Sequence, residues 1–288
     1  MASTTGLFYT VAGKASPIDF YVGRSVLGQG ITWMEQWNYG SGDDVVDDAN
    51  SLGLGIIAGT QSGYFSQMHR SQLHFNCASI PDNAVIQSAS LRLYIVSTQN
   101  TINMTTPKND FVIVSATCAS DTQATASDYY RLNYGTTPLA ARVAQVSLTV
   151  STNNTFALNL TGLAYISKTG LTRFGLRWGC DVDNSAPAFV NRGWGNINVY
   201  AADISTATST SPMLSVVYFT PIKNIRFDSA GTKYTFVTDD ATATDKFRCY
   251  SGATVLGFSV VSTGAANASA YRCCTISGTA QSFASTAT

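Results

Sequence analysis

Alternation of apolar and polar residues is the clearest pattern in the first three quarters of the chain. In the segment 89–97, Leu91 and Leu93 fall on one side, and Arg92 and Tyr94 fall on the other. Successive side chains of a strand point to opposite faces, so this period of two predicts a half-buried β-strand. Further strand-like runs occur at residues 7–11, 71–76, 111–115, 143–150, 155–160, 172–178 and 213–219.

The strand predicted at residues 71–76 carries one of the two histidines of the chain. Leu73 and Phe75 alternate with Gln72 and His74, so the pattern places His74 on the outer face, in solvent. We do not expect a surface histidine without an orienting carboxylate to take part in catalysis.

One segment predicts a helix. Thr161 is a suitable N-cap, Leu163 and Ile166 lie one turn apart, and Gly170 suits the left-handed position that ends a helix. The remaining segments are short strands separated by turn residues, which is typical of antiparallel all-β proteins.

These elements predict an all-β protein: an antiparallel jelly-roll β-sandwich with one short helix, followed by a small C-terminal β-sandwich domain. Residues 1–30 are rich in glycine and form an N-terminal arm or first strand, and residues 31–219 form the jelly roll. A boundary falls near Pro221, and five strand-like runs within residues 220–288 form the small domain.

Charge limits the classes of partner. The 288 residues include 17 basic and 17 acidic side chains, so the net charge is zero and the basic residues form no cluster. Nucleic acid is therefore not an expected partner, because phosphate binding needs clustered Lys and Arg. No apolar run is long enough to cross a membrane, and the N-terminal residues lack the pattern of a signal peptide. We expect synthesis in the cytoplasm and release to an extracellular or virion surface by a route such as phage lysis.

The cysteines do not predict a metal site. None of them forms a Cys-x-x-Cys pair, and two histidines in the whole chain are few for zinc. We expect buried thiols that act as small apolar side chains, with disulfides as the alternative. The six are Cys77, Cys118, Cys180, Cys249, Cys273 and Cys274.

One long segment resembles a known family. Residues 70–95 read as an apolar strand, then Ile80-Pro-Asp-Asn, then an Ala-x-Leu-x-Leu strand, which is similar to the signature of DNRLRE-type jelly-roll domains. A helix ending at Gly170 before a Phe-Gly-Leu-Arg strand, and the closing strand at 211–218, are also similar. The resemblance spans roughly residues 31–219 and departs from the family around Asn38, where its Asn-Tyr-Gly segment is matched only loosely. It implies a sandwich of carbohydrate-binding-module type, found in secreted glycan-binding proteins and phage structural proteins.

Catalytic patterns are scarce. The sequence contains neither a Gly-x-Ser-x-Gly elbow nor a phosphate-binding Gly-x-x-x-x-Gly-Lys loop. Paired carboxylates for glycoside hydrolysis are one interpretation of the acidic residues near the N-terminus, and a solvated acidic turn is the favoured one. These residues are Glu35, Asp43, Asp44, Asp47 and Asp48. We therefore predict that the chain is not an enzyme.

Calcium is the one cofactor that the pattern suggests. Asp181 and Asp183 place carboxylates at alternate positions of one segment, and hard cations bind such oxygen ligands. The spacing lacks the glycine and the distal glutamate of an EF-hand loop, and a structural Asx-turn is the alternative.

Three tryptophans are candidates for a glycan-binding platform, because exposed aromatic rings stack against sugars. Trp194 lies between two glycines, in a loop-like context that favours exposure, and Trp33 and Trp37 are the other candidates. The alternative for each is a place in the core or at an interface.

We expect a non-enzymatic structural protein of a phage virion, such as a head-decoration, fibre or tail-associated component. It would act by packing against copies of itself, with a trimer expected by analogy, and against other virion proteins. The alternative is a carbohydrate-binding module that recognises a cell-surface or extracellular glycan, including a glycan of the host surface.

Overall fold

The computed structural model describes residues 3–10, 18–204 and 209–220, and beyond them the backbone of six strands between residues 224 and 281. The chain divides into two compact units. The larger unit contains Thr5–Asp82 and Ile86–Val217, and the smaller contains Tyr218–Thr288 together with Met1–Thr4 and Asn83–Val85.

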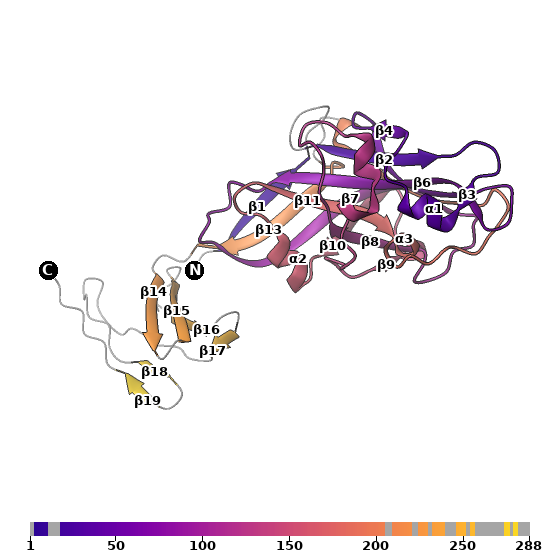
Figure 1. The fold of residues 1–288 in the computed structure, drawn as a ribbon. Helices are drawn as coiled ribbons and strands as arrows, with labels where there is room; N and C mark the ends of the chain where they lie inside the picture. Colours follow the sequence, from indigo (N-terminus) through magenta and orange to yellow (C-terminus); the bar gives the residue numbers. More distant parts are fainter. Residues whose placement is uncertain are drawn as a thin grey trace. The chain divides into compact units, whose positions relative to one another are not determined.

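The larger unit is built on one antiparallel sheet that curls (Figure 1). The strand order is β1-β13-β7-β12-β5-β6-β11-β8-β9, with β10 beside β7, β2 and β3 beside β6, and β4 beside β2. The strands are β1 (Thr4–Tyr9), β2 (Asp19–Ser25), β3 (Ile31–Thr32), β4 (Asp44–Val46), β5 (Ser51–Ala58), β6 (Tyr64–Asn76), β7 (Val85–Asn100), β8 (Asp110–Ser115), β9 (Val143–Ala144), β10 (Thr152–Ala157), β11 (Leu171–Trp178), β12 (Trp194–Tyr200) and β13 (Met213–Phe219). The prediction of a mostly β, antiparallel protein with few helices is confirmed.

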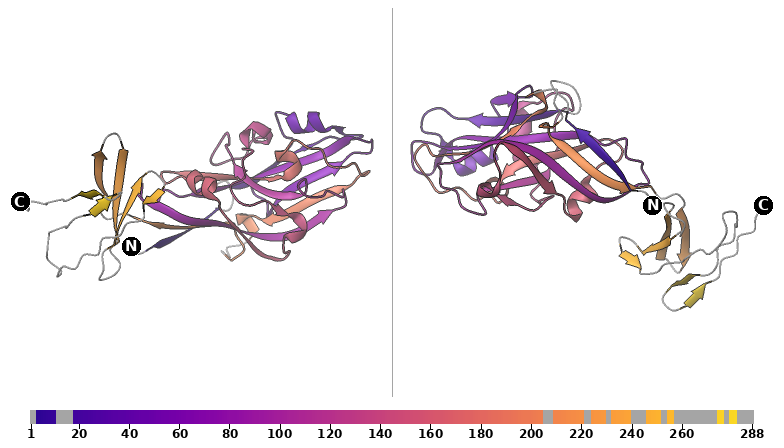
Figure 2. Two further views of the ribbon diagram at one scale, coloured as in Figure 1. Left: turned by 90° about the horizontal axis from the view of Figure 1, so that it is seen from below. Right: turned by 180° about the vertical axis from the view of Figure 1, so that it is seen from behind.

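Two long strands, β6 and β7, produce the curl (Figure 2). The first half of β6 pairs with β5, whereas its second half, residues 71–76, pairs with β11. Strand β7 pairs with β10 over residues 90–95 and with β12 over residues 95–100, and its Ile95 has a partner in both strands. Since these long strands each connect several partners, the sheet bends over an apolar interior.

The described part of the segment 1–30 belongs to this sheet. Strand β1 pairs with β13, and β2 pairs with both β6 and β4. Residues 11–17, which also belong to the predicted arm, lie outside the described residues.

Strand β7 confirms the alternation that the sequence predicts. Leu91 and Leu93 are fully buried, whereas Arg92 and Tyr94 are half-buried on the other face. The interior that receives these leucines also contains Phe20, Leu52, Leu54, Ile56, Phe75, Phe111, Phe174, Leu176, Trp178, Ile197, Val199, Leu214 and Val216. Burial of such side chains is the main stabilising contribution to the fold.

Strand β6 does not follow its predicted exposure, because His74 is fully buried. The loop after β8 covers the face that was expected to meet solvent, and Gln72 donates a hydrogen bond from Nε2 to the Thr117 carbonyl at 3.0 Å. The ring of Phe20 meets the His74 ring edge-on, with centroids 5.5 Å apart. The strand is therefore buried on both faces, which alternation within the strand alone could not reveal.

The helices are short, and they only partly match the helix predicted from the sequence. The predicted helix begins at Leu160 rather than after Thr161, because the side chain of Asn159 accepts the hydrogen bond of the Gly162 N–H at 2.9 Å. A helix also forms where short strands were predicted, and its capping box joins Thr32 and Glu35. The helices are α1 (Trp33–Asn38), α2 (Leu160–Tyr165) and α3 (Gly179–Val182), with 3-10 turns at Ala126–Tyr129, Arg131–Asn133, Gln145–Ser147 and Ala202–Ile204.

The smaller unit contains a four-stranded antiparallel sheet of order β14-β15-β16-β17 and a two-stranded sheet, β18-β19. The strands are β14 (Asn224–Ser229), β15 (Thr232–Asp239), β16 (Lys246–Ser251), β17 (Thr254–Leu256), β18 (Cys274–Ile276) and β19 (Thr279–Gln281). In neither unit does a described helix combine the length and the apolar character that crossing a membrane requires.

Candidate functional site: a polar groove beside an exposed tryptophan

The outer face of strand β5 forms the floor of a groove. In the run Leu52-Gly-Leu-Gly-Ile56 the three apolar side chains are buried, so both glycines lie on the opposite face. No side chain rises from Gly53 or Gly55, and side chains of the neighbouring strands β6 and β12 line the space above them. We call the resulting cavity, which has a volume of about 300 Å³, the Trp194 groove. It is lined by Tyr21, Ala49, Ser51, Gly53, Gly55, Gln67, His69, Trp194, Asn196 and Asn198.

Two asparagines of β12 form one wall. Asn196 lies opposite Gly55 and Asn198 lies opposite Gly53 in the register with β5. Asn198 donates from Nδ2 to the Ser97 hydroxyl at 3.0 Å, and its Oδ1 lies 3.9 Å from where a Cβ of Gly53 would be. The side-chain oxygen Oδ1 of Asn198 therefore faces the floor of the groove, where it can accept a hydrogen bond. The side-chain amide of Asn196 has no hydrogen-bond partner among the described residues, so it offers both donor and acceptor.

Trp194 marks one end of the groove, and its side chain is 40% exposed. Its backbone is held on both sides by Thr101: the Trp194 N–H donates to Oγ1 at 2.8 Å, and the Thr101 N–H donates to the Trp194 carbonyl at 2.8 Å. The indole thus projects from a fixed backbone, and it offers a flat apolar surface to a ligand.

A stacked pair of rings, Tyr21 and His69, contributes to the opposite wall. Their centroids are 5.2 Å apart and their planes differ by 19°. Gly23 allows this arrangement, because a Cβ at that position would lie 2.3 Å from Cδ2 of His69. The Nδ1 atom of His69 lies 3.4 Å from where a Cβ of Gly55 would be, so this nitrogen is the one next to the floor.

The lining carries no full charge. Burial lowers the pKa of His69, although the carboxylate of Asp44, 3.5 Å from Nε2, acts in the opposite direction. The imidazole is therefore neutral at physiological pH. The nearby carboxylate of Asp43 is neutralised by Arg24, whose guanidinium donates to it at 2.6 Å. The groove consequently suits an uncharged ligand with many hydroxyl groups.

The three tryptophans do not form one platform. Trp33 is buried against Phe65, with ring centroids 5.2 Å apart, and it donates from Nε1 to Asn184. Trp37 is half-buried under the guanidinium of Arg131 and donates from Nε1 to a main-chain carbonyl. Trp33 and Trp37 therefore stabilise the fold around α1, and only Trp194 lines the groove.

Arginines hold the two residues that were predicted as calcium ligands. Asp181 is buried and accepts hydrogen bonds from Arg70 and Arg177. Asp183 forms a bidentate pair with Arg142, with both N–O distances at 2.6 Å. Both oxygens of each carboxylate accept hydrogen bonds from guanidinium groups, so neither carboxylate keeps an oxygen for a cation, and the arrangement does not support a calcium site.

The acidic residues near the N-terminus also have structural partners. Glu35 accepts hydrogen bonds from the Thr32 backbone and hydroxyl, and Asp47 accepts one from the Ala124 N–H at 3.1 Å. These contacts cap α1 and fix the loop after β8, and neither carboxylate lines the groove.

Most residues of the groove were not predicted from the sequence. Tyr21, His69, Asn196 and Asn198 were not candidates, and they come from three different strands. Two signals were present: the Leu-Gly-Leu-Gly-Ile run of β5, and the alternation Asn-Ile-Asn-Val in β12, which places both amides on one face.

No protein-family model matches the chain, and no curated protein matches it. The resemblance to DNRLRE-type domains therefore stays a prediction.

Proposed function

We propose that this protein is a non-catalytic binding module that recognises an uncharged carbohydrate in the Trp194 groove. The observation that carries the proposal is the exposed indole of Trp194 beside a groove lined by amides, two hydroxyl groups and bare glycine backbone. Sugars combine apolar C–H faces with hydroxyl groups, so they need an aromatic surface together with donors and acceptors in fixed positions.

The chemistry of the lining supports binding rather than hydrolysis. Glycoside hydrolysis uses two carboxyl groups that flank the glycosidic bond. The lining contains no carboxylate, and the carboxylate of Asp44 lies 3.5 Å from Nε2 of His69. Asn196, Asn198 and Gln67 instead supply amide groups, which bind hydroxyls without taking part in proton transfer.

The experiment is affinity electrophoresis of the full chain through gels that contain neutral polysaccharides, namely glucans, mannans, galactans and xylans. We expect retardation by at least one of them, and loss of that retardation in Trp194→Ala. Leu160→Ala is the matched control, because it removes an exposed apolar side chain from α2, outside the groove.

Two results would contradict the proposal. One is an unretarded wild-type chain in every neutral polysaccharide. The other is retardation of Trp194→Ala equal to that of the wild type, which would place the binding surface elsewhere.

The curled sheet is consistent with the two faces of a jelly roll, and we propose that architecture for the larger unit. The several partners of β6 and β7 bend a single sheet back over one interior, as a sandwich requires. A carbohydrate-binding role on such a scaffold agrees with the resemblance to DNRLRE-type domains.

A second proposal is that the protein is a virion surface component that packs against copies of itself, with the groove facing a host glycan. The observation in its favour is the edge strand β1, Thr4–Tyr9, which has a single strand neighbour among the described strands and carries no charged residue. Its Leu7 is 52% exposed, and an uncharged edge can pair with another chain.

Light scattering of the full chain tests this second proposal. We expect an oligomer, with a trimer as the analogy suggests, and a lower mass for Leu7→Lys or for a chain without residues 220–288. A wild-type monomer would contradict the packing role and would leave carbohydrate binding as a separate question.

A further inference from the structure

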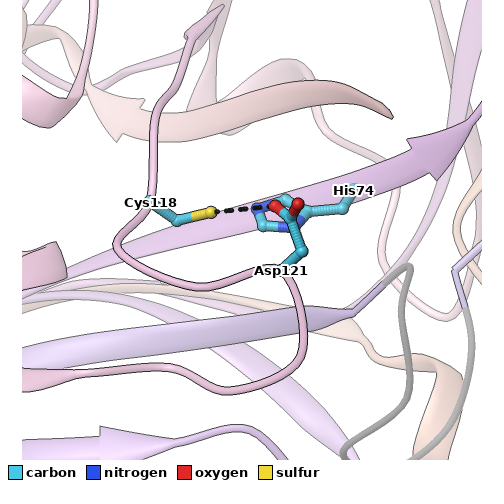
Figure 3. A group of neighbouring side chains, drawn as sticks. All are labelled: His74, Cys118 and Asp121. Atoms are coloured by element: carbon cyan, nitrogen blue, oxygen red, sulfur yellow. Dashed lines mark hydrogen bonds between the residues drawn. The ribbon is translucent and has the colours of Figure 1, made fainter. Parts of the chain in front are cut away.

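Three side chains with metal-binding atoms meet away from the Trp194 groove. A ring nitrogen of His74, the sulfur of Cys118 and a carboxylate oxygen of Asp121 lie within 4.8 Å of one another. Figure 3 shows them converging, His74 from strand β6 and the other two from the loop after β8. Nitrogen, sulfur and oxygen donors of these types are those that bind zinc in proteins.

The hydrogen bonds around His74 leave it with a free lone pair. Gln72 donates from Nε2 to the Thr117 carbonyl, so its Oε1 is the atom that faces Nε2 of His74 at 3.1 Å. A carbonyl oxygen can only accept, so Nε2 carries the proton and Nδ1 is unprotonated. Nδ1 is buried and has no hydrogen-bond partner among the described residues. Burial, with a smaller contribution from Arg173, lowers the pKa of His74 to about 3, so the ring is neutral at physiological pH.

A histidine held in this way resembles a metal ligand. Metal-bound histidines commonly donate their other ring N–H to an oxygen acceptor, which fixes the tautomer and the ring orientation. Gln72 supplies that acceptor here. A buried nitrogen without a partner destabilises the fold, so a ligand bound to Nδ1 would remove an unfavourable contribution.

The thiol and the carboxylate have the separation of two ligands in a tetrahedral site. Sγ of Cys118 lies 3.6 Å from Oδ1 of Asp121, and the thiol donates to that oxygen. Zn–S and Zn–O bonds of the usual lengths at a tetrahedral angle give a sulfur–oxygen distance of roughly 3.6 Å. A metal ion can therefore take the position of the thiol proton without a large movement of either side chain.

Arg173 has two opposite effects on this cluster. It donates to Asp121 through Nε and through NH2, which lowers the pKa of the carboxyl group and fixes its orientation. Its positive charge also repels a cation. Both hydrogen bonds from Arg173 go to Oδ1, the oxygen that also accepts from the thiol, and they leave Oδ2 without an arginine partner among the described residues. Since Arg173 already balances the charge of Asp121, we expect weaker metal binding than at a four-ligand structural site.

We propose that His74, Cys118 and Asp121 form a binding site for a zinc-type transition-metal ion, with water as the fourth ligand. Binding breaks the S–H bond of Cys118, forms a metal–sulfur bond and releases the proton to solvent. The site tethers the loop after β8 to strand β6.

The test is a cobalt(II) titration of the full-length, reduced protein, followed by the thiolate-to-metal charge-transfer absorption and by competition with zinc. We expect one ion per chain with this absorption, its loss in Cys118→Ser, and at least about a tenfold weaker affinity in Asp121→Asn. Asp43→Asn is the matched control, because Asp43 is also an exposed carboxylate that accepts from an arginine. Cys249→Ser controls for thiols elsewhere in the chain.

The proposal is overturned if the wild type shows no charge-transfer absorption, or if Cys118→Ser or Asp121→Asn binds as the wild type does. It is also overturned if Asp43→Asn weakens binding as much as Asp121→Asn. His74→Gln should abolish binding, and if this buried variant fails to fold, the two loop variants decide the outcome.

Discussion

Arg70 and Asp181, which lie 111 residues apart in the chain, form a bidentate ion pair in the interior, with N–O distances of 2.9 and 2.6 Å. Arg177 donates to the same carboxylate at 2.7 Å. Although burial alone would raise the pKa of Asp181, the guanidinium groups of Arg177 and Arg70 hold it well below its usual range. One carboxylate thus joins β6, β11 and α3.

Loss of this carboxylate charge is predicted to destabilise the fold strongly. In Asp181→Asn, two buried guanidinium groups lose their counter-charge, and we expect the free energy of unfolding to fall by about 3–5 kcal/mol. Asp183→Asn is the control, since it breaks the more exposed pair with Arg142 and should lower that free energy by about 1 kcal/mol or less. Urea unfolding measures both, and equal effects would contradict the assignment of Asp181 to the interior.

The stability of the protein is predicted not to depend on calcium. Arginines occupy the carboxylates of Asp181 and Asp183, so a cation gains no free pair of ligands there. We expect the same Tm in calcium and in a chelator. A ligand that binds only the folded state raises Tm, so a higher Tm in calcium would reveal a cation site.

Gly23 is predicted to be necessary for the wall of the Trp194 groove. The Cβ of Gly23→Ala would overlap the ring of His69, which must shift away from Tyr21. We expect a loss of about 1–3 kcal/mol in the free energy of unfolding and weaker retardation by the polysaccharide. Gly40→Ala, whose Cβ would meet no atom within 4 Å, should change stability by less than about 0.5 kcal/mol. A Gly23→Ala chain that unfolds and binds as the wild type does would refute the steric argument.

His74 is predicted to make stability fall in acid. Its pKa is about 3 in the folded protein, whereas a histidine in an unfolded chain titrates near 6.5. Below pH 6.5 the unfolded state binds this proton more readily, so the contribution decreases by about 1.4 kcal/mol per pH unit down to the folded pKa. It is constant above pH 6.5.

Asp19 acts in the opposite direction over much of the same range, because burial raises its pKa from 3.8 to about 7. The measurement is therefore the difference between the pH profiles of unfolding free energy for the wild type and His74→Gln, in which the contribution of Asp19 cancels. We expect this difference to slope below pH 6.5 and to be flat above it. A slope that appears only above 6.5 would contradict the assignment to His74.

Asn198 is predicted to contribute directly to ligand binding. Its Nδ2 is held by Ser97 and its Oδ1 faces the floor, so a sugar hydroxyl can donate to it without reorganisation of the side chain. Asn198→Ala should weaken the affinity for the retarding polysaccharide by about tenfold, which corresponds to one hydrogen bond. Asn153→Ala removes an amide from β10, outside the groove, and should bind as the wild type does. Equal losses in the two variants would contradict a direct contact.

Features that depend only on neighbours along the chain could be predicted from the sequence. The period of two within one strand is enough to predict that Leu91 is buried and that Tyr94 lies on the opposite, half-buried face. The flanking glycines of Trp194 suggested a loop with an exposed ring, with a buried ring as the alternative. The residue is exposed, but it begins strand β12.

Features that depend on distant segments could not be predicted in this way. His74 is buried because a loop more than forty residues later covers it, as its contact through Gln72 with Thr117, 45 residues away, shows. Asp181 was predicted to be a calcium ligand in a loop, because the local sequence does not reveal its partner. That partner, Arg70, lies 111 residues earlier in the chain. The groove itself depends on the register of β12, β5 and β6, which brings residues from separate strands to one surface.

Because the floor of the Trp194 groove is glycine backbone, the residues of β5 that stabilise the fold are different from the residues that line the groove walls. Leu52, Leu54 and Ile56 stabilise the interior from one face of β5, while the opposite face presents only backbone around Gly53 and Gly55. If the groove binds carbohydrate as proposed, changes of ligand preference can therefore arise at wall positions without any change in the packing beneath them. A combinatorial library at Ser51, Gln67, Asn196 and Asn198 would then select sugar-binding reagents on this scaffold.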